Sequence, residues 1–377
     1  MSKILILANH YNTLRIFRRE LIKKLVELGN EVIISIPSCE QEEIDNLISY
    51  GASVVVTEME RRGMNPIKDL KLMRAYKKLL KEINPDKVIT YTIKPNIYGS
   101  MACKSAHIPH FCNVTGLGST FMANGGLMRA IVSFLYKISM NKADRIFFEN
   151  VGNRNTLVNA KVVRAEQTVV MAGAGVNIDE FPFCEYLEDD GCVHFLNVGR
   201  IMKEKGVDEL FYAIRKIKKE FPNTTFDFIG WYEDNYRETV ESMQAENLIS
   251  FHGFQKNVKP FIEKAHCIIH PSYHEGMSNT LLEACSMGRP VITSNIHGCK
   301  EAVDEGKNGL LFEVKNGEDL YNKIKEFILL SYETKKEMGT YAREFVAEHF
   351  NKTDVVEKTI SIVAPYKSEA VTTPTKQ

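Results

Sequence analysis

The chain has 377 residues, of which 44% are hydrophobic and 25% charged. This length and composition predict a soluble globular protein with two domains rather than one. Lys plus Arg and Asp plus Glu both total 48, so the formal net charge is zero and no global field attracts nucleic acid. The 8 cysteines form no C-x-x-C pair and no zinc-like spacing, which is typical of reduced cytosolic thiols.

The beginning of the chain carries no apolar run long enough for a signal peptide before Arg15. No stretch approaches the roughly 20 apolar residues that a transmembrane helix needs. We therefore expect a cytoplasmic protein, with peripheral attachment to the inner face of the cell membrane still open.

Short β-rich runs alternate with helix-period segments such as Phe17 to Leu28 and Asp69 to Lys81. In the first half the expected strands are Ile4 to Ala8, Glu31 to Ser35, Ser53 to Thr57, Lys87 to Thr92, Phe111 to Val114, Arg145 to Phe148 and Thr168 to Met171. In the second half they are Val193 to Val198, Phe226 to Ile229, Ile249 to His252, Cys267 to His270, Val291 to Thr293 and Gly309 to Phe312. This alternation predicts an α/β fold of two Rossmann-like, doubly wound parallel sheets.

The alternation pauses between Asp179 and Gly191, where prolines, acidic residues and a glycine cluster. We predict a first domain over residues 1–178 and a second over 191–345. A helix is expected over 346–366, and the polar residues 367–377 are expected to be disordered.

The segment Asn197-Val-Gly-Arg-Ile-Met-Lys-Glu-Lys-Gly206 follows an expected strand and opens a helix. Gly199 allows a close approach of the backbone to a ligand, while Arg200 and Lys205 place two cations where a helix N-terminus already favours anions. A diphosphate suits this arrangement. The alternative is an ordinary strand-to-helix turn with solvated basic side chains.

A second motif, His274-Glu-Gly-Met-Ser-Asn-Thr-Leu-Leu-Glu283-Ala, follows the strand that ends at His270. Glu275 is expected in the loop at the carboxyl end of that strand, where ligands of open α/β sheets bind. Glu283 is expected one turn into the next helix. It has a structural alternative, because Thr280-x-x-Glu283 fits a helix capping box. A capping box does not explain Glu275.

With these two motifs the chain resembles, over nearly its whole length, the retaining glycosyltransferases of family 4, which share the G-R-x4-K-G segment and the E-x7-E motif. The resemblance implies the GT-B fold, in which the C-terminal helix returns to the first domain. It implies that Arg200 and Lys205 neutralise a donor diphosphate, that Glu275 contacts the donor sugar, and that Glu283 holds the ribose. The other donor-binding residues that it implies are Gly199, Phe254, Gly276, Met277, Ser278, Asn279, Thr280 and Leu281, with backbone amides of Ser278 to Leu281 around the phosphates.

The loop Asn113-Val-Thr-Gly-Leu-Gly-Ser119, taken with the second motif, is similar to bacterial enzymes that build capsule, O-antigen or lipid-linked glycans. That resemblance implies a UDP-sugar donor, often N-acetylated, and a lipid-diphosphate glycan acceptor. Thr115 and Gly116 would face the cleft opposite the donor. Many members carry a histidine in this loop where Thr115 stands, so no protein base is assigned.

The first expected strand leads to His10 and Asn12, which could bind an acceptor sugar. A polar surface loop is the alternative. No D-x-D motif appears and no metal ligand set is expected, so we predict no cofactor and no metal requirement. The charge at the diphosphate would be stabilised by Arg200 and Lys205 instead.

Basic residues concentrate in the segment 61–81, and apolar residues recur at helical spacing between Leu117 and Met140. Both could meet an anionic lipid surface, or could be ordinary helix faces over a core. The basic residues are Arg61, Arg62, Lys68, Lys71, Arg74, Lys77, Lys78 and Lys81. Two rival functions are a UDP-sugar epimerase of the same fold and a silent scaffold for another transferase. The presence of Arg200, Lys205 and Glu275 disfavours both.

Overall fold

A computed structural model describes residues 1–60, 65–118 and 126–365. The chain divides into two compact units that interleave along the sequence. The smaller unit holds residues 1–113, 138–146 and 353–365, and the larger unit holds the described residues of 114–137 and 147–352. The domain boundaries predicted from the sequence stay predictions. The predicted tail 367–377, together with Arg61 and Arg62 of the basic segment, lies outside the described residues.

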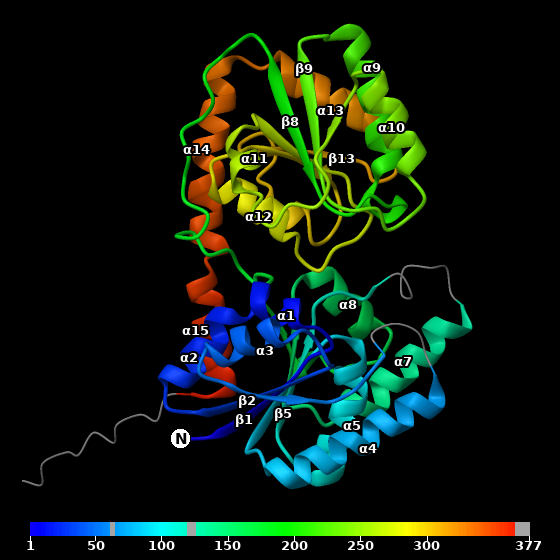
Figure 1. The fold of residues 1–377 in the computed structure, drawn as a ribbon, viewed down its shortest axis with the longest axis vertical. Coiled ribbons are helices and arrows are strands. Elements are labelled where there is room, and N and C mark those ends of the chain that lie inside the picture. Colours follow the sequence, from blue (N-terminus) through cyan, green and yellow to red (C-terminus); the bar gives the residue numbers. More distant parts are fainter. Residues whose placement is uncertain (61–64, 119–125, 366–377) are drawn as a thin grey trace, which may run out of the picture. The chain divides into compact units, whose positions relative to one another are not determined.

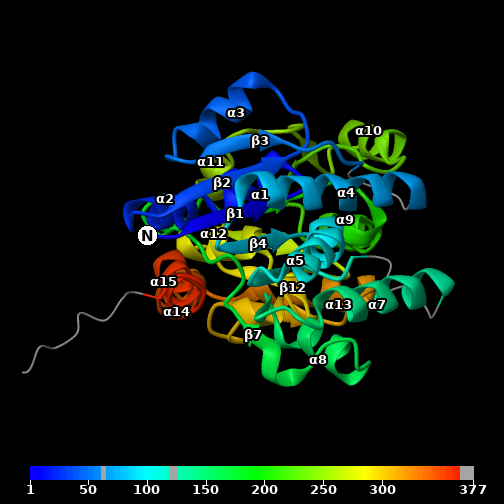
Figure 2. The same cartoon turned by 90° about the horizontal axis from the view of Figure 1, so that it is seen from below.

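Two parallel sheets form the framework, as the alternating pattern predicted, and every expected strand is present. The seven-stranded sheet has the order β3-β2-β1-β4-β5-β6-β7, and Figure 2 shows β3, β2, β1 and β4 in this sequence. Its strands are β1 (Lys3–Leu7), β2 (Glu31–Ile36), β3 (Ser53–Val56), β4 (Lys87–Tyr91), β5 (His110–Val114), β6 (Arg145–Phe148) and β7 (Thr168–Val170). The six-stranded sheet has the order β10-β9-β8-β11-β12-β13. Its strands are β8 (Val193–Val198), β9 (Thr224–Ile229), β10 (Ser250–Phe251), β11 (Cys267–His270), β12 (Val291–Ser294) and β13 (Gly309–Phe312).

Helices cover the smaller unit's strands because the strands are apolar on both faces. Leu5, Leu7 and Val88 pack against Tyr76 and Leu80 in a buried cluster. The helices of this part are α1 (Tyr11–Phe17), α2 (Arg19–Glu27), α3 (Gln41–Ile48), α4 (Pro66–Ile83), α5 (Ser100–Ala106) and α15 (Lys352–Val363). The Nζ of Lys87 at the start of β4 donates to the Val363 carbonyl at the end of α15, 2.6 Å away. The C-terminal helix therefore packs within the smaller unit.

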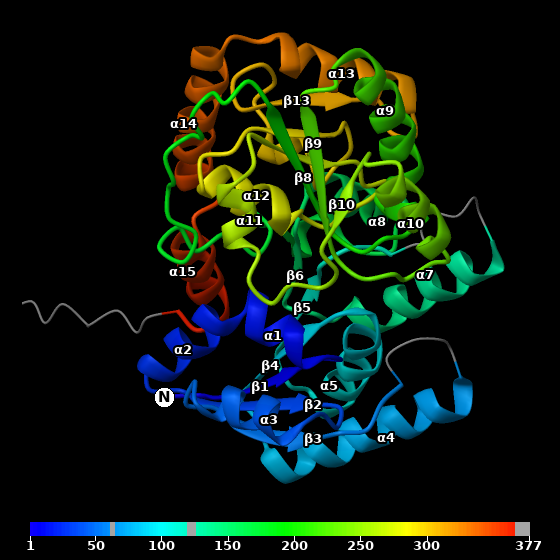
Figure 3. The ribbon, with the colours of Figure 1, turned by 45° about the horizontal axis from the view of Figure 1, so that its top comes forward.

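In the larger unit, helices lie on both faces of the sheet (Figures 1 and 3). Alternate residues of a strand point to opposite faces and so pack against different layers of helices. Phe195 and Phe226 pack under α9 (Val207–Glu220), α10 (Arg237–Ala245) and α13 (Gly317–Leu329). Leu196 and Ile268 pack under α11 (Lys259–Glu263), α12 (Asn279–Ser286) and α14 (Tyr332–His349). Helices α7 (Leu127–Met140) and α8 (Val151–Asn159) precede this sheet in sequence. Among the described residues, no helix combines the length and apolar character that would cross a bilayer.

The segment 179–191, predicted as a domain boundary, is held to the larger unit by hydrogen bonds from two arginines. Arg289 is fully buried, and its guanidinium donates to the carbonyls of Cys184 and Glu185, each at 2.9 Å. Arg343 donates to the carbonyls of Ile178 and Phe181, at 3.2 and 3.1 Å. The stretch is irregular in sequence, but its backbone is anchored by these side chains.

A buried histidine at the amino-terminal end of β11 makes the stability of the larger unit depend on pH. The Nδ1 of His266 accepts from the His194 amide at 3.0 Å, and the two rings stack with centroids 5.1 Å apart. Burial lowers the pKa of His266 from 6.5 to about 4, and His194 adds to the effect. The unfolded chain therefore binds more protons than the folded chain between these values, and stability is lost as pH falls through that window.

We expect the His266→Asn variant to lose less stability than the parent protein between pH 6.5 and pH 4. An asparagine oxygen can accept from the His194 amide without becoming charged. The shift in the pKa of His266 corresponds to a loss of about 3 kcal/mol in the free energy of unfolding as the pH falls. The variant should not show this loss. Urea midpoints of both proteins at pH 4.5 and 7 measure this difference. An identical acid loss in the two proteins would contradict the assignment.

Candidate active site

Two loops of the larger unit meet at the point where the order of the six-stranded sheet reverses. Strands β8 and β11 are neighbours, with Phe195 paired to Cys267 and Leu196 to Ile268. The next strand in sequence after β8 lies on its other side. Loops that leave the carboxyl ends of two such strands border the crevice in which open α/β sheets bind ligands. Here these loops carry the two motifs singled out from the sequence.

The loop after β8 is held rigidly before it enters α9. The Gly199 amide donates to the Ile229 carbonyl, and the Ile201 amide donates to the Trp231 carbonyl, both at 2.9 Å. A short 3-10 turn, Lys203–Lys205, then leads to Gly206, which is the N-cap of α9. Lys205 thus projects from a fixed turn immediately before a helix N-terminus, the position at which anions are favoured.

Gly206 ends this turn in the left-handed backbone conformation, with φ +70°. A Cβ on Gly206 would lie 2.0 Å from the Pro271 carbonyl oxygen. The Gly206→Ala variant must therefore strain its backbone and push the two loops apart. We expect a loss of stability of about 2 kcal/mol or more together with a large loss of transfer activity. Urea unfolding and an activity assay measure the two effects.

Gly306→Ala is the matched control, because Gly306 has φ +81° and no atom within 4 Å of the added Cβ. That variant should show backbone strain alone, about 1 kcal/mol, and keep its activity. If both variants lose the same stability and activity, the contact with Pro271 has no role in holding the loops.

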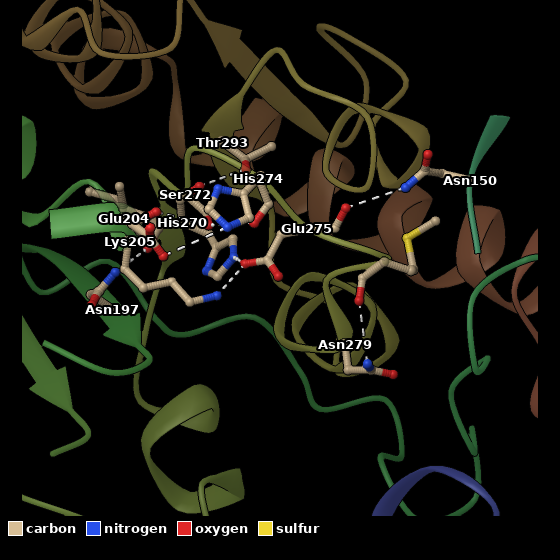
Figure 4. A network of polar contacts seen from close by, with 12 residues as sticks. Asn150, Asn197, Glu204, Lys205, His270, Ser272, His274, Glu275, Asn279 and Thr293 are labelled. Atoms are coloured by element: carbon tan, nitrogen blue, oxygen red, sulfur yellow. Dashed lines mark hydrogen bonds and ion pairs between the residues drawn. The ribbon is translucent and has the colours of Figure 1, made fainter. Parts of the chain in front are cut away.

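Glu275 is the centre of a small charged network (Figure 4). Its Oε1 accepts a hydrogen bond from the Lys205 ammonium and a second from the His270 Nε2 at 3.0 Å. The side chains of Lys205 and Glu275 are 20% and 16% exposed, so each keeps an edge open to a ligand. A charge-assisted pair in this setting fixes both side chains in one geometry.

The electrostatics of the network keep Glu275 ionised. Burial alone would raise the pKa of this carboxyl group, but the Lys205 cation and the hydrogen bond from His270 outweigh burial and hold the pKa well below its usual range. Glu275 is therefore an acceptor of hydrogen bonds at neutral pH. It can bind hydroxyl groups of a sugar, and it is poorly suited to donate a proton.

A pocket of about 190 Å³ opens beside this network. Residues of the larger unit line it from the loop after β5, from α8 and from both motif loops. The lining residues are Thr115, Gly116, Leu117, Gly118, Asn153, Arg200, Met202, Glu204, Lys205, His274, Glu275 and Gly276. The pocket therefore combines two cations with the carboxylate of Glu275.

The segments that line this pocket are in close contact with one another. A Cβ on Gly276 would lie 2.0 Å from the Thr115 carbonyl oxygen, so only glycine permits this approach. Asn150 donates to the carbonyls of Glu275 and Gly276, at 3.3 and 2.5 Å. The side-chain Nδ2 of Asn153 is buried without a hydrogen-bond partner, and an uncompensated buried donor is costly unless a ligand supplies the acceptor.

The expected phosphate cradle at α12 is partly occupied by the protein itself. The Ser278 amide donates to the Gly298 carbonyl at 2.8 Å. The amides of Asn279, Thr280 and Leu281 open the helix and have no preceding turn to bond to. Met277 and Leu281 are buried in the core below α12. Of the four amides expected around a diphosphate, three thus remain at the helix start.

Glu283 lies on α12 outside the set of pocket-lining residues. The capping alternative is wrong, because Ser278 is the N-cap and Thr280 lies inside the helix. Burial raises the pKa of Glu283 to about 7, against the opposing effect of Lys352. Neither the helix cap nor the pocket wall uses this carboxyl group in the structure.

The remaining predicted residues are not among those that line the pocket. Phe254 is 61% exposed, and its ring meets the Trp231 ring edge-on, at an interplanar angle of 72°. His10 and Asn12 belong to the smaller unit. There the His10 Nδ1 accepts from the Asn12 amide, 3.1 Å away, and caps α1. The structural role of His10 is therefore clear, and acceptor binding by either residue stays a prediction.

Sequence reasoning missed His270, Asn150 and Asn153. His270 had a weak signal, since it ends the strand directly before the second motif. The two asparagines had none, because they approach the pocket from α8, more than a hundred positions earlier in the chain. Among the described residues, no group of His, Cys, Asp and Glu side chains is arranged to hold a metal ion.

Two family models match the chain, one in each half. The model of group 1 glycosyl transferases matches residues 185–345, and the model of glycosyl transferase 4-like proteins matches residues 3–150. These matches together span most of the sequence. The chain therefore belongs to the glycosyltransferases of this group.

Relatives cover most of the chain at modest identity. A protein of Campylobacter jejuni named N,N'-diacetylbacillosaminyl-diphospho-undecaprenol alpha-1,3-N-acetylgalactosaminyltransferase is 28% identical over 82% of this chain and 84% of its own length. An uncharacterized glycosyltransferase of Methanocaldococcus jannaschii is 26% identical over 86% of this chain and 87% of its own. Anabaena HepE, solved with UDP and glucose, has a TM-score of 0.78 at 16% identity, over 97% of this chain and all of its own. The likeness to HepE confirms the GT-B fold.

Proposed function

We propose that this glycosyltransferase moves a sugar from a UDP-sugar, with an N-acetylated hexosamine as the candidate, to a lipid-diphosphate-linked glycan. The observation that carries the proposal is the pocket in which Arg200 and Lys205 stand beside the ionised Glu275. Two cations suit a diphosphate, and a carboxylate that only accepts hydrogen bonds suits sugar hydroxyls. The C. jejuni relative's name supports both the N-acetylated sugar and the diphospho-undecaprenol acceptor.

The anomeric configuration of the sugar is expected to be retained. In this mechanism the acceptor hydroxyl attacks from the face of the leaving group, and the departing phosphate oxygen takes its proton. Lys205 and Arg200 stabilise the negative charge that develops on the diphosphate, which is the largest contribution that a preorganised site makes. Thr115, which lines the pocket, cannot act as a base. This mechanism needs none.

Two described surfaces support attachment to the inner face of the cell membrane. On α4 the cations Lys71, Arg74, Lys77 and Lys81 are exposed. On α7 the apolar residues Met128, Ile131 and Phe134 are exposed, and that helix carries no acidic residue. Such faces suit an anionic lipid surface, where a lipid-linked acceptor would be found.

The direct test is a transfer assay with purified protein, a synthetic polyprenyl-diphosphate sugar as acceptor, and a panel of UDP-, GDP- and ADP-sugars. We expect product only from UDP-sugars, in the presence of EDTA, with the donor's anomeric configuration kept. NMR of the product reports the configuration. Transfer only from another nucleotide, an inverted product, or loss of activity with EDTA would each refute the corresponding part of the proposal.

A further inference from the structure

The larger unit has a second cavity, at the edge of the six-stranded sheet where its strands begin. Val193 begins β8, Asn223 precedes β9 and His266 precedes β11. These residues and Lys335 line a cavity of about 440 Å³, which we call the amino-edge pocket. The motif loops of the candidate active site leave the opposite ends of the same parallel strands. The amino-edge pocket is therefore a separate site.

A buried ammonium group lines this pocket without a counterion. Lys335 lies near the start of α14 and is 8% exposed. Its Nζ donates to the Ile328 carbonyl at 2.9 Å, but among the described residues no carboxylate oxygen lies within 4 Å of it. Burial lowers the pKa of Lys335, and Asp189 offsets this effect only in part. Because a buried charge without a partner is costly, an anion in the pocket would be stabilised there.

A second buried donor belongs to the same pocket. His266 is 4% exposed, and its Nδ1 accepts from the His194 amide at 3.0 Å, so the neutral ring carries its proton on Nε2. In the part of the chain that the structure describes, this Nε2 has no hydrogen-bond partner. Tyr332, the first residue of α14, also lines the pocket, and a helix N-terminus favours anions. Three features of the pocket thus suit a negative charge.

The acidic residues of the lining are engaged elsewhere. Lys325 donates to one carboxylate oxygen of Glu220, and the Tyr321 hydroxyl donates to the other. Asp189 is exposed, and its carboxylate accepts from the Gly191 amide at 3.0 Å. Neither carboxylate therefore takes the place of a ligand at Lys335.

We infer that the amino-edge pocket binds a small organic anion, a carboxylate or a phosphate ester, whose charged group is held by Lys335 and His266. The apolar part of the ligand contacts Phe221, Pro222 and Leu330, which also line the pocket. The volume suits a small molecule, since such sites usually measure roughly 300–1,000 Å³. The proposed sugar transfer uses none of these residues, so the inference and the proposed function stand or fall separately.

A cysteine in the lining reports on occupancy of the pocket. Cys192 is half-buried and lines it. We expect phenyl phosphate, benzoate or both to slow the alkylation of Cys192 by iodoacetamide saturably in the full-length protein, as measured by peptide mass spectrometry. The anion that protects identifies the class of ligand. Cys39 is the internal control, because it is also half-buried but lies in the smaller unit, and burial raises the pKa of both thiols. Its rate should not change. Phenol, which has the ring without the anionic group, should not protect Cys192.

Two variants test the role of the buried ammonium. Lys335→Met should raise the anion concentration needed for half-protection of Cys192 about tenfold or more, because a charge-assisted hydrogen bond is lost. Lys336→Met is the matched control, since Lys336 is exposed on the same helix and does not line the pocket. It should keep the parental value. The inference is overturned if neither anion protects Cys192 in the parent protein, if phenol protects it equally well, or if Lys335→Met keeps the parental half-protection concentration.

Discussion

Replacing Lys205 by alanine is expected to slow sugar transfer by a factor on the order of 10² to 10³. The ammonium of Lys205 binds Glu275 in the free protein and lines the pocket, so it is placed to bind the departing diphosphate. A cation fixed before the reaction stabilises developing charge without reorganisation. The rate at saturating donor should fall more than the affinity for UDP-sugar, which Arg200 and the α12 amides still support.

Lys203→Ala is the matched control for this prediction. Lys203 lies in the same 3-10 turn but is exposed and does not line the pocket. The Lys203→Ala variant should keep near-parental activity. It thereby distinguishes the effect of removing any nearby positive charge from the effect of removing the Lys205 ammonium. Initial rates over a range of donor concentrations give kcat and KM for both variants. A Lys205→Ala enzyme with parental kcat would refute the assignment of this residue.

Glu275 adds a second test of the same pair. Removing Lys205 alone leaves a carboxylate in a mostly buried site, and removing Glu275 alone leaves an ammonium there, so each single change should cost stability. The double variant Lys205→Met with Glu275→Gln removes both charges and should lose less stability than the sum of the single changes. Both single variants should still lose activity. Urea midpoints and rates of the three proteins distinguish a structural pair from a catalytic one.

Replacing Arg289 by methionine is expected to destabilise the larger unit by about 4 kcal/mol or more. The side chain is 0% exposed, and its guanidinium donates to backbone carbonyls from three separate segments. These are Cys184, Glu185, Ile262, Glu263, Met287 and Gly288. Each buried carbonyl that loses its donor costs about 1–3 kcal/mol if nothing replaces it. Lysine offers a single compact group of donors and should rescue little of the loss.

Trp231 fluorescence during urea unfolding measures this effect, since Trp231 belongs to the same unit as Arg289. Arg215→Ala is the comparison, because Arg215 pairs with Glu246 at the surface, where both side chains are more than 40% exposed. That change should cost under about 1 kcal/mol. Equal midpoints for the two variants would show that the carbonyls around Arg289 find other partners.

Much of the fold could be predicted because it depends on local patterns. Strand and helix periods predicted each strand and helix α4 (Pro66–Ile83), and the alternation of elements requires parallel sheets. The helix expected from Phe17 to Leu28 is confirmed as α2 (Arg19–Glu27), but Phe17 instead ends the separate helix α1 (Tyr11–Phe17), which stops at Arg18. No local pattern marks that break, because Arg18 ends one helix through its backbone and its side chain is held by the ring of Tyr91, 5.0 Å away.

From the sequence alone, Arg200, Lys205 and Glu275 could be predicted to bind a nucleotide-sugar, since each lies in a motif that follows an expected strand of a parallel sheet. How these three side chains interact could be seen only in the folded chain. In the structure Lys205 pairs with Glu275, His270 reaches the same carboxylate oxygen, Thr115 and Asn153 join the pocket lining, and Glu283 lies outside it. These relations join residues far apart in the chain. Their geometry depends on backbone register, glycine contacts and burial, which no local sequence pattern encodes.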